Sequence, residues 1–353
     1  MRIRTLIGSL GIGRPFPVRV ESMVRTPLDQ PEECLREIHS LHEEGCELVR
    51  IAFPEIGLAD NLLKVVSSSP VETMADIHFD HRLAIMAIKS GCRSIRINPG
   101  NMGCSRSLIE LSRLINAAET IVRVGANAGS LSRSQMEKAE GDTSRALFET
   151  VSEQILTLQK LGVERIIMSA KSSSIPVTLK ANTLLAGKFR YPVHVGLTES
   201  GPGQRGTIKS CVAISSLLGS GIGDTIRVSL TGPSVDEVIV GKRILQALEI
   251  RRFEPELISC PACGRRRVDV ASLVERIEPL LKGLPAELTV AVMGCEVNGP
   301  QEASNADIGV AGTPSGIMLF ARGKAIGACA AAVIESRFIE VCKEQGYLLK
   351  NQI

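Results

Sequence analysis

The sequence predicts an α/β protein in which a (β/α)8 TIM-like barrel is followed by a small α+β domain. Three observations support this fold class. Short β-branched runs alternate with amphipathic helical patterns, polar residues gather where the runs end, and the pattern changes near Ile258. Aromatic residues make up only 3% of the 353 residues and Trp is absent, so Val, Ile, Leu and Ala must form the core, as in buried parallel sheets.

Eight runs in the first 230 residues have the composition of strands: Val18–Met23, Glu47–Phe53, Glu72–His78, Ser94–Asn98, Ile121–Asn127, Arg165–Ala170, Val193–Thr198 and Thr225–Leu230. Helical patterns lie between them, among them Pro31–Glu44, Arg82–Ser90, Ser105–Ala118, Ser144–Leu161 and Thr207–Leu218. This alternation predicts a parallel sheet. An open doubly wound sheet has the same local pattern, and the count of eight favours the barrel.

Polar side chains stand at the C-terminal end of every predicted strand, whereas the strand interiors are nearly all apolar. They are Glu21, Ser22, Arg50, Asp76, His78, Arg96, Asn98, Arg123, Asn127, Ser169, Lys171, His194, Thr198, Arg227 and Ser229. Any one of them is explained as well by a surface loop. Their recurrence at every strand indicates a site at the C-terminal end of the barrel, where such proteins carry their chemistry.

A helix predicted over Val235–Leu248 covers the eighth strand, and the following segment with Arg251, Arg252 and Pro255 marks a boundary. We therefore predict a barrel domain over residues 1–254 and a second domain over residues 255–353. The second domain is expected to contain a strand leading into SCPACGRRR, a helix over Val270–Leu281, a strand over Leu288–Met293, a hairpin over Gly316–Ala325 and a final helix over Ala330–Gln345.

Charge and hydropathy argue against two classes of partner. The net charge of +3 and the scarcity of aromatic residues favour neither a nucleic acid nor a membrane surface. The most apolar stretch, Ala325–Ile334, is shorter than the roughly 20 residues of a spanning helix. The N-terminal apolar run is broken by Gly8, Gly11 and Gly13, so we expect a cytoplasmic protein.

Cys260, Cys263 and Cys295 form the one cluster among ten cysteines. A CxxC pair places two thiols on one turn, and Cys295 ends the next strand of the same domain. A structural zinc site needs four Cys or His ligands, and the C-terminal domain has no His. Three thiolates therefore favour an iron–sulfur cluster over zinc, with one iron left for a weaker ligand such as the Glu302 carboxylate or a substrate.

A set of cations is expected at the C-terminal end of the barrel: Arg50, Arg96, Arg123, Lys171 and Arg227, with Arg205 and Lys209 nearby. Arg side chains pair well with phosphate oxygens. The Gly201–Gly206 segment after the seventh strand is either a phosphate loop at a helix N-terminus or a flexible loop. Asp76 and His78 share a strand face, either as a metal-binding or acid–base pair or as hydrogen-bonding core groups.

Six segments carry a resemblance to a known family. They are ADIHFD (75–80), RINPGN (96–101), NAGSL (127–131), GIGDTIRVSL (221–230), ISCPACGR (258–265) and GCEVNGPQEA (294–303). In order and over nearly the whole chain, they resemble the 4-hydroxy-3-methylbut-2-enyl diphosphate synthase family. The first strand departs from the family, because Glu21–Thr26 reads ESMVRT where a Gln-Ser-Met-Thr-Asn-Thr-like run is usual.

The resemblance implies an oxidoreductase with a [4Fe-4S] cluster held by Cys260, Cys263, Cys295 and Glu302. The implied reaction is the reductive ring opening and dehydration of 2-C-methyl-D-erythritol 2,4-cyclodiphosphate in the non-mevalonate isoprenoid pathway. Electrons would come from a flavodoxin or ferredoxin. The family works as a homodimer, in which the barrel of one subunit faces the cluster of the other.

The resemblance also implies roles for individual residues. Arg50, Arg96, Arg123 and Asn127 match diphosphate-binding positions, and Asp76, His78, Lys171 and Lys209 are carried over as substrate-binding residues, to which we add Asn98 at a strand end. Glu302 is the expected catalytic residue, as the ligand that a substrate displaces. Two alternatives remain: a phosphosugar- or pterin-binding barrel with structural zinc, and an iron–sulfur electron carrier or redox sensor.

Overall fold

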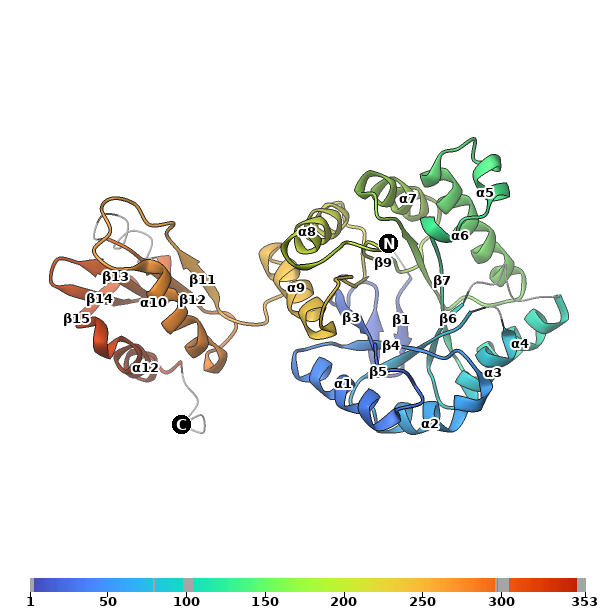
Figure 1. The fold of residues 1–353 in the computed structure, drawn as a ribbon, viewed down its shortest axis with the longest axis horizontal. Coiled ribbons are helices and arrows are strands. Elements are labelled where there is room, and N and C mark those ends of the chain that lie inside the picture. The colour runs from blue at the N-terminus through green and yellow to red at the C-terminus, as the bar shows by residue number, and fades with distance from the viewer. Residues whose placement is uncertain (1–2, 79, 98–104, 296, 298–304, 348–353) are drawn as a thin grey trace. The chain divides into compact units, whose positions relative to one another are not determined.

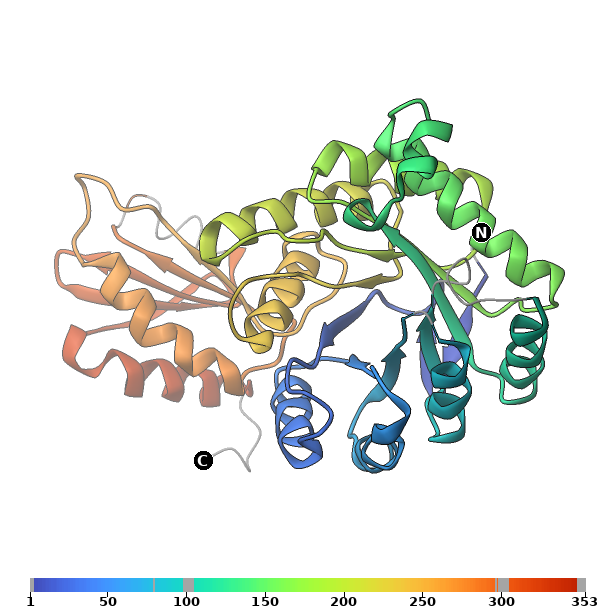
Figure 2. The same cartoon turned by 45° about the vertical axis from the view of Figure 1, so that its right-hand side comes forward.

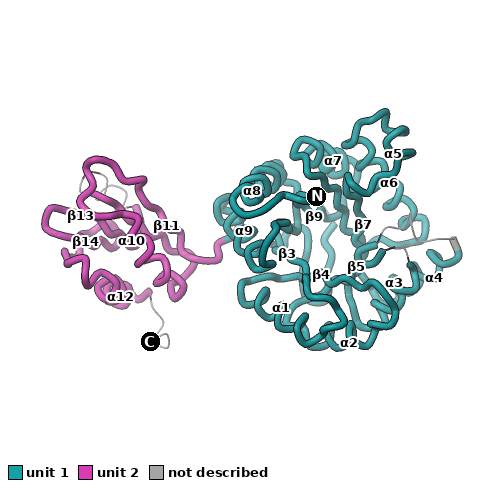
Figure 3. The backbone as a smooth tube through the Cα atoms, in the orientation of Figure 1, with its two compact units in different colours: residues 1–251 teal, residues 252–353 magenta. Residues whose placement is uncertain are grey.

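The computed structural model describes residues 3–78, 80–97, 105–295, 297 and 305–347. The chain divides into two compact units, Met1–Arg251 and Arg252–Ile353 (Figure 3). The sequence predicts this boundary after residue 254. In the described part of the chain, no helix combines the length and the apolar character that crossing a bilayer requires.

The first unit is a ring of parallel strands with helices around it (Figures 1 and 2), which confirms the predicted barrel. Hydrogen bonds join the strands in the order β8-β7-β6-β5-β4-β3-β10-β9, and a parallel bridge between Met168 and Val193 links the two ends of this order. The strands are β3 (Arg19–Met23), β4 (Leu48–Ala52), β5 (Glu72–Asp76), β6 (Ser94–Ile97), β7 (Ile121–Asn127), β8 (Ile166–Lys171), β9 (His194–Val195) and β10 (Thr225–Ile226).

The helices of this unit begin where their sequences carry start signals. Pro31 opens the first helix with two acidic residues in its first turn, and Asp142 caps another by accepting bonds from the Ser144 and Arg145 amides. The helices are α1 (Pro31–Glu43), α2 (Ala59–Ser68), α3 (His81–Lys89), α4 (Ser105–Ala117), α5 (Arg133–Lys138), α6 (Thr143–Lys160), α7 (Ile175–Lys188), α8 (Gly203–Gly219) and α9 (Ser234–Ala247), with short 3-10 turns at Ile56–Leu58 and Ala128–Ser130.

A β-hairpin that the sequence did not predict closes the N-terminal end of the barrel. β1 (Thr5–Ile7) pairs with β2 (Leu10–Ile12) across a two-residue turn that begins at Gly8, whose φ is 55°. Ile7 and Ile12 are fully buried against side chains from β4, β5, β7 and β8. Gly8, the first of the glycines that interrupt the N-terminal apolar run, therefore serves this hairpin, because a two-residue turn favours Gly at its first position.

β9 and β10 are shorter than predicted, at two residues each. The two segments approach each other closely just beyond the paired residues, where position 196 is a glycine. A Cβ atom on Gly196 would lie 2.3 Å from the Arg227 carbonyl oxygen. The segments predicted to continue as strands to Thr198 and Leu230 instead lead into the loops above the barrel.

The second unit is a five-stranded mixed sheet in the order β11-β12-β13-β14-β15. The strands are β11 (Glu256–Ser259), β12 (Thr289–Met293), β13 (Ile308–Thr313), β14 (Gly316–Ala321) and β15 (Lys324–Cys329); the helices are α10 (Val270–Ile277) and α12 (Ile334–Glu344), with 3-10 turns at Glu278–Gly283 and Ala331–Val333. No strand was predicted for β13, which lies in the segment after the second predicted strand of this unit. Residues of both helices pack on the sheet in one apolar core.

Candidate functional site

A cavity of about 250 Å3 opens at the C-terminal ends of the barrel strands. We call it the mouth cavity. It is lined by Arg50, Asp76, His78, Arg96, Arg123, Gly125, Asn127, Ser130, Ser169, Lys171, His194, Leu197, Thr198, Arg227 and Ser229. Parallel strands bring these residues together because all of them present their C-terminal ends on the same side of the ring.

Most of the predicted substrate-binding residues meet in this cavity. Arg50, Asp76, His78, Arg96, Arg123, Asn127 and Lys171 all line it, and their binding role stays a prediction. Asn98 lies outside the described residues. Lys209 is half-buried on α8 and is not among the lining residues.

The predicted phosphate loop is also separate from the described lining of the mouth cavity. It leads into α8, which begins at Gly203. Gly206 has a packing role, since a Cβ atom there would lie 2.2 Å from the Gly201 carbonyl oxygen. This close approach explains a glycine at that position without any ligand.

Asp76 acts as an anchor for arginines at the edge of the cavity. Its carboxylate lies 3.3 Å from Arg50 Nε and 3.1 Å from Arg96 Nη1, and Arg96 Nη1 is 3.1 Å from His78 Nε2. Burial would raise the pKa of Asp76, but the attraction of Arg50 and Arg96 outweighs it and holds the pKa below its usual value. The carboxylate therefore stays ionised and orients two cations.

A second buried network crosses the floor of the cavity, and no sequence pattern predicted its pairing. Glu21 on β3 accepts two bonds from Arg123 Nη1, at 2.7 and 2.6 Å. His194 Nδ1 lies 3.4 Å from the same carboxylate and 2.8 Å from Thr225 Oγ1. His194 Nε2 lies 2.8 Å from Lys171 Nζ.

The electrostatics of the cavity favour an anion. Its described lining holds four arginines and Lys171 but a single carboxylate, Asp76. Burial lowers the pKa of Arg50 to about 10 against the pull of Asp76. Arg123 Nη2 is buried and finds no hydrogen-bond partner among the described residues. A buried donor without a hydrogen bond costs free energy, so the site is suited to an oxyanion that would accept from it.

Arg25, part of the atypical first-strand segment, reaches a third carboxylate. Its Nη2 atom donates to the Leu230 carbonyl at 2.9 Å and to Glu237 Oε1 at 2.9 Å. Glu237 also lies 3.3 Å from Arg227 and is fully buried. Arg25 thus ties the loop after β3 to the loop after β10, beside the mouth cavity.

In the second unit, two of the three clustered cysteines stand at neighbouring strand ends. Cys260 directly follows β11, and Cys295 lies two residues beyond β12, its parallel neighbour. The Gly294 amide donates to Cys260 Sγ at 3.2 Å. A Cβ atom on Gly294 would lie 2.8 Å from Val270 and 3.4 Å from that sulfur, so glycine is needed for this approach.

The CxxC loop folds back over the same strand end. Ala262 has a left-handed φ of 56°, and the Arg267 amide donates to the Gly294 carbonyl at 2.7 Å. Cys263 is exposed, Cys260 is half-buried and Cys295 is buried. The loop and the end of β12 therefore bring the CxxC pair and Cys295 to the same edge of the sheet.

These residues fit an iron–sulfur cluster in donor chemistry. No three His, Cys, Asp or Glu side chains among the described residues are arranged to hold a metal ion, and Glu302 lies outside those residues. The fit rests on the three thiols and on the Gly294 amide, which donates to Cys260 Sγ. Hydrogen bonds of this kind to the cysteine sulfurs are common at iron–sulfur clusters. Elsewhere in this unit, burial raises the pKa of Cys342 to about 12, which makes that thiol a poor ligand.

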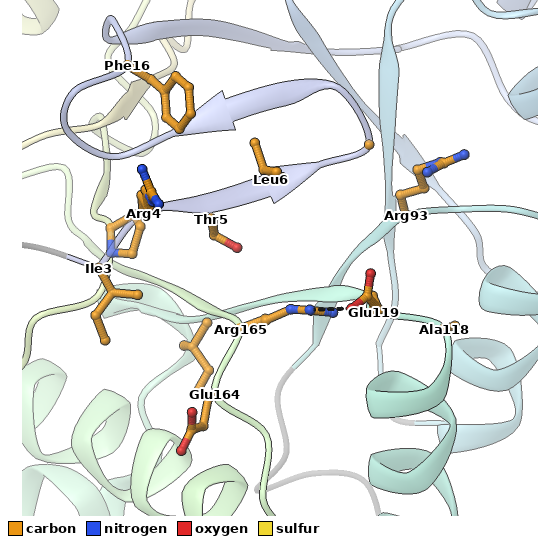
Figure 4. Close-up of a pocket in the computed structure, with 13 residues that line it drawn as sticks. Ile3, Arg4, Thr5, Leu6, Phe16, Arg93, Ala118, Glu119, Glu164 and Arg165 are labelled. Carbon is orange, nitrogen blue, oxygen red and sulfur yellow. Dashed lines mark hydrogen bonds and ion pairs between the residues drawn. The ribbon is translucent and has the colours of Figure 1, made fainter.

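A larger cavity of about 520 Å3 lies at the other end of the barrel, beside the hairpin (Figure 4). Arg165 and Glu119 in its wall form an ion pair of 2.5 Å, with side chains 44% and 73% exposed. Exposed, paired charges of this kind are solvated surface groups. Buried charged side chains, by contrast, line the mouth cavity, although that cavity is smaller.

Comparison with known proteins covers both units. A family model described as the GcpE TIM-barrel domain matches residues 3–242, and one described as the GcpE protein C-terminal domain matches residues 256–344. A protein of Caldanaerobacter subterraneus is 42% identical over 318 residues, covering 90% of each chain. One of Corynebacterium diphtheriae is 40% identical over 345 residues, covering 98% of this chain and 87% of the relative.

Both relatives are named 4-hydroxy-3-methylbut-2-en-1-yl diphosphate synthase (flavodoxin). Among solved structures, dihydropteroate synthase of Yersinia pestis matches with a TM-score of 0.50 and 12% identity, covering 71% of this chain and 100% of that chain. At such low identity the likeness concerns the barrel fold alone.

Proposed function

Since the chain belongs to the GcpE family, we propose that it is a flavodoxin-dependent 4-hydroxy-3-methylbut-2-en-1-yl diphosphate synthase. Its substrate is 2-C-methyl-D-erythritol 2,4-cyclodiphosphate, an intermediate of the non-mevalonate isoprenoid pathway. The observation that carries the proposal is the cationic mouth cavity, in which a buried guanidinium nitrogen of Arg123 lacks a partner among the described residues. A diphosphate would provide that partner.

The reaction consumes two electrons and, counted for the neutral acids, two protons. One carbon–oxygen bond to the diphosphate breaks, so the ring opens while the diphosphate stays attached through its other end. One hydroxyl group leaves as water and a carbon–carbon double bond forms. The protein must therefore hold a diphosphate through the whole reaction and supply protons beside it.

The barrel residues provide the hold. Arg50, Arg96 and Arg123 reach the cavity from three different strands, and the carboxylates of Asp76 and Glu21 anchor their guanidinium groups before a ligand arrives. Positioning of this kind reduces the entropy lost on binding. Asn127 at the end of β7 adds an amide that can bind a phosphate or hydroxyl oxygen.

Cys260, Cys263, Cys295 and Glu302 would hold a [4Fe-4S] cluster, which when bound supplies the two electrons. Three consecutive arginines, Arg265 to Arg267, are exposed beside the exposed Cys263. Positive charge around the cluster site favours docking of an acidic protein electron donor. This agrees with the flavodoxin in the relatives' names.

An anaerobic assay with the cyclic diphosphate, reduced flavodoxin and purified protein tests the proposal. We expect formation of the open-chain diphosphate, together with iron and acid-labile sulfide in the protein. Cys295→Ser should lose the brown absorbance and turnover, and Glu302→Ala should keep the cluster but lose most activity. Zinc without iron would instead support the alternative of a pterin- or phosphosugar-binding barrel.

The expected homodimer and the cytoplasmic location stay predictions. The pairing of one subunit's barrel with the other's cluster is checked by mixing Cys295→Ser protein with Arg123→Met protein. Turnover recovered in the mixed dimer would support a shared site. If each subunit works alone, the mixture should stay inactive.

A further inference from the structure

Lys171 and His194 form a buried pair that the proposed reaction does not yet use. Lys171 is the last residue of β8 and His194 is the first residue of β9. Their side chains approach to 2.8 Å, from Lys171 Nζ to His194 Nε2. Both residues are almost fully buried, at 6% and 1% exposed, yet both line the mouth cavity.

The contacts of His194 favour one position for its ring proton. Nδ1 faces Thr225 Oγ1 at 2.8 Å and the Glu21 carboxylate at 3.4 Å, so we assign the ring proton to Nδ1. Nε2 then has a lone pair that accepts a bond from Lys171. A doubly protonated ring facing a protonated amine would put two donors face to face at this distance, so the pair holds at most one positive charge.

The groups around the pair disfavour even that charge when no ligand is bound. Arg50, Arg123 and Arg227 all repel a positive amine at Lys171, and Glu21 opposes them. Burial, reinforced by these arginines, lowers the pKa of Lys171 well below its usual value. Burial, followed by Lys171 and Arg123, does the same to the pKa of His194. A diphosphate would reverse this balance by placing negative charge against the amine.

We propose that the Lys171–His194 pair takes up one proton from solvent when a diphosphate enters the mouth cavity, and that His194 is the positioning residue for the Lys171 amine. The proton moves from water or buffer to Lys171 Nζ, which keeps its bond to His194 Nε2 and gains a donor for a phosphate oxygen. The proton is released when the ligand leaves. This inference rests on the proposed function, because it requires a diphosphate ligand.

Proton uptake makes affinity depend on pH. At pH values where Lys171 is neutral in the free protein and protonated in the complex, the affinity for the diphosphate should fall about tenfold per pH unit. The cyclic diphosphate is a suitable probe because each of its phosphorus atoms carries one strongly acidic group and titrates no further near neutral pH. Any proton taken up therefore belongs to the protein.

Titration calorimetry of the full-length, cluster-containing protein without reductant measures this uptake. Binding of the cyclic diphosphate at one pH in buffers of different ionisation enthalpy should show about one proton taken up per ligand. Lys180→Met is the control, because Lys180 is an exposed lysine paired with Asp142. It should bind with the same proton uptake as the unaltered protein.

Two substitutions separate the proton from the positive charge. Lys171→Arg keeps a permanent charge, so it should bind with little proton uptake and a flat pH dependence, whereas Lys171→Met should bind more weakly at every pH. His194→Gln keeps an acceptor but removes the ring. It should raise KM more than it lowers kcat and shift the pH profile of KM.

Three outcomes decide between the proposals. Ligand binding with no proton uptake from about pH 6 to 9, where an unperturbed lysine would stay charged, would overturn this inference and leave the proposed function intact. Unchanged proton uptake in Lys171→Arg would overturn it as well. Absence of any diphosphate binding would contradict the proposed function itself and this inference with it.

Discussion

Glu21 is the residue on which the charges of the barrel floor converge. It is fully buried and holds Arg123, which is itself only 2% exposed, while His194 approaches the same carboxylate. Breaking a buried ion pair from one side leaves the other charge without compensation. Glu21 therefore stabilises the ligand-free barrel, and its negative charge at the same time weakens the attraction of the barrel for an anion.

Glu21→Gln should lower the free energy of unfolding of the ligand-free protein by about 3 kcal/mol and tighten binding of the cyclic diphosphate. The amide oxygen of Gln can still accept a bond from Arg123 and keep its position, but the charge of Arg123 is then unopposed, and this is the cause of both effects. Urea unfolding and titration calorimetry measure them. Glu47→Gln serves as the control, since Glu47 pairs with Arg19 near the start of β3, away from the cavity. Equal affinities in Glu21→Gln and Glu47→Gln would contradict this account.

Lys171 should also make the stability of the free protein rise with pH. Because its folded pKa lies well below the usual 10.5, the unfolded chain binds a proton that the folded chain does not, at every pH between the two values. The free energy of unfolding should therefore increase by about 1.4 kcal/mol per pH unit in that window. Lys171→Met should lack this increment in urea unfolding measured at a series of pH values below 10.5. Parallel profiles for the two proteins would show that Lys171 is charged in the fold.

At the scale of elements, the β1–β2 hairpin contributes to the stability of the barrel, and the strand-end loops at the opposite end carry the residues of the candidate site. The hairpin packs Ile7 and Ile12 against the starts of the strands, while the mouth cavity lies at their opposite ends. Substitutions in the hairpin should therefore alter the free energy of unfolding without changing the affinity for the ligand.

Ile12→Ala should cost about 2–4 kcal/mol of unfolding free energy, because a fully buried side chain is replaced by a cavity. The affinity for the cyclic diphosphate should stay unchanged. Leu6→Ala in the same hairpin is the matched control, since Leu6 is 55% exposed and should lose less than about 0.5 kcal/mol. A large change of affinity in Ile12→Ala would refute this separation.

At the scale of the whole molecule, the two units have separate tasks in the proposed reaction. The described lining of the mouth cavity comes from the first unit alone, and the clustered cysteines belong to the second. A substitution in one unit should therefore abolish either diphosphate binding or electron supply and leave the other intact.

Cys260→Ser should abolish iron binding and turnover while the affinity for the cyclic diphosphate changes less than about threefold, or 0.6 kcal/mol. Iron analysis, the anaerobic assay and calorimetry on one preparation measure all three quantities. Arg123→Met should show the reverse pattern, with iron retained and binding lost. Loss of diphosphate binding in the Cys260→Ser protein would show that the cluster itself takes part in holding the ligand.

The eight barrel strands and the residue types gathered at each candidate site could be predicted from the sequence, whereas the β1–β2 hairpin and β13 were not. Strand and helix patterns depend on neighbouring residues in the chain, so all eight barrel strands were predicted within a few residues of their observed positions. The CxxC spacing and the polar residues at strand ends are equally local. They identified the cysteine cluster and most of the described residues that line the mouth cavity.

Which charges meet could not be predicted from the sequence and depends on the closure of the barrel. Arg123 and Glu21 are 102 residues apart in the chain, and Lys171 meets His194 because β8 and β9 close the ring. Lys209 has the right charge but lies outside the described lining of the cavity. An ion pair depends on the distance between two groups and on their burial, which barrel closure sets. A strand depends on the alternation and branching of adjacent side chains, which the sequence shows directly.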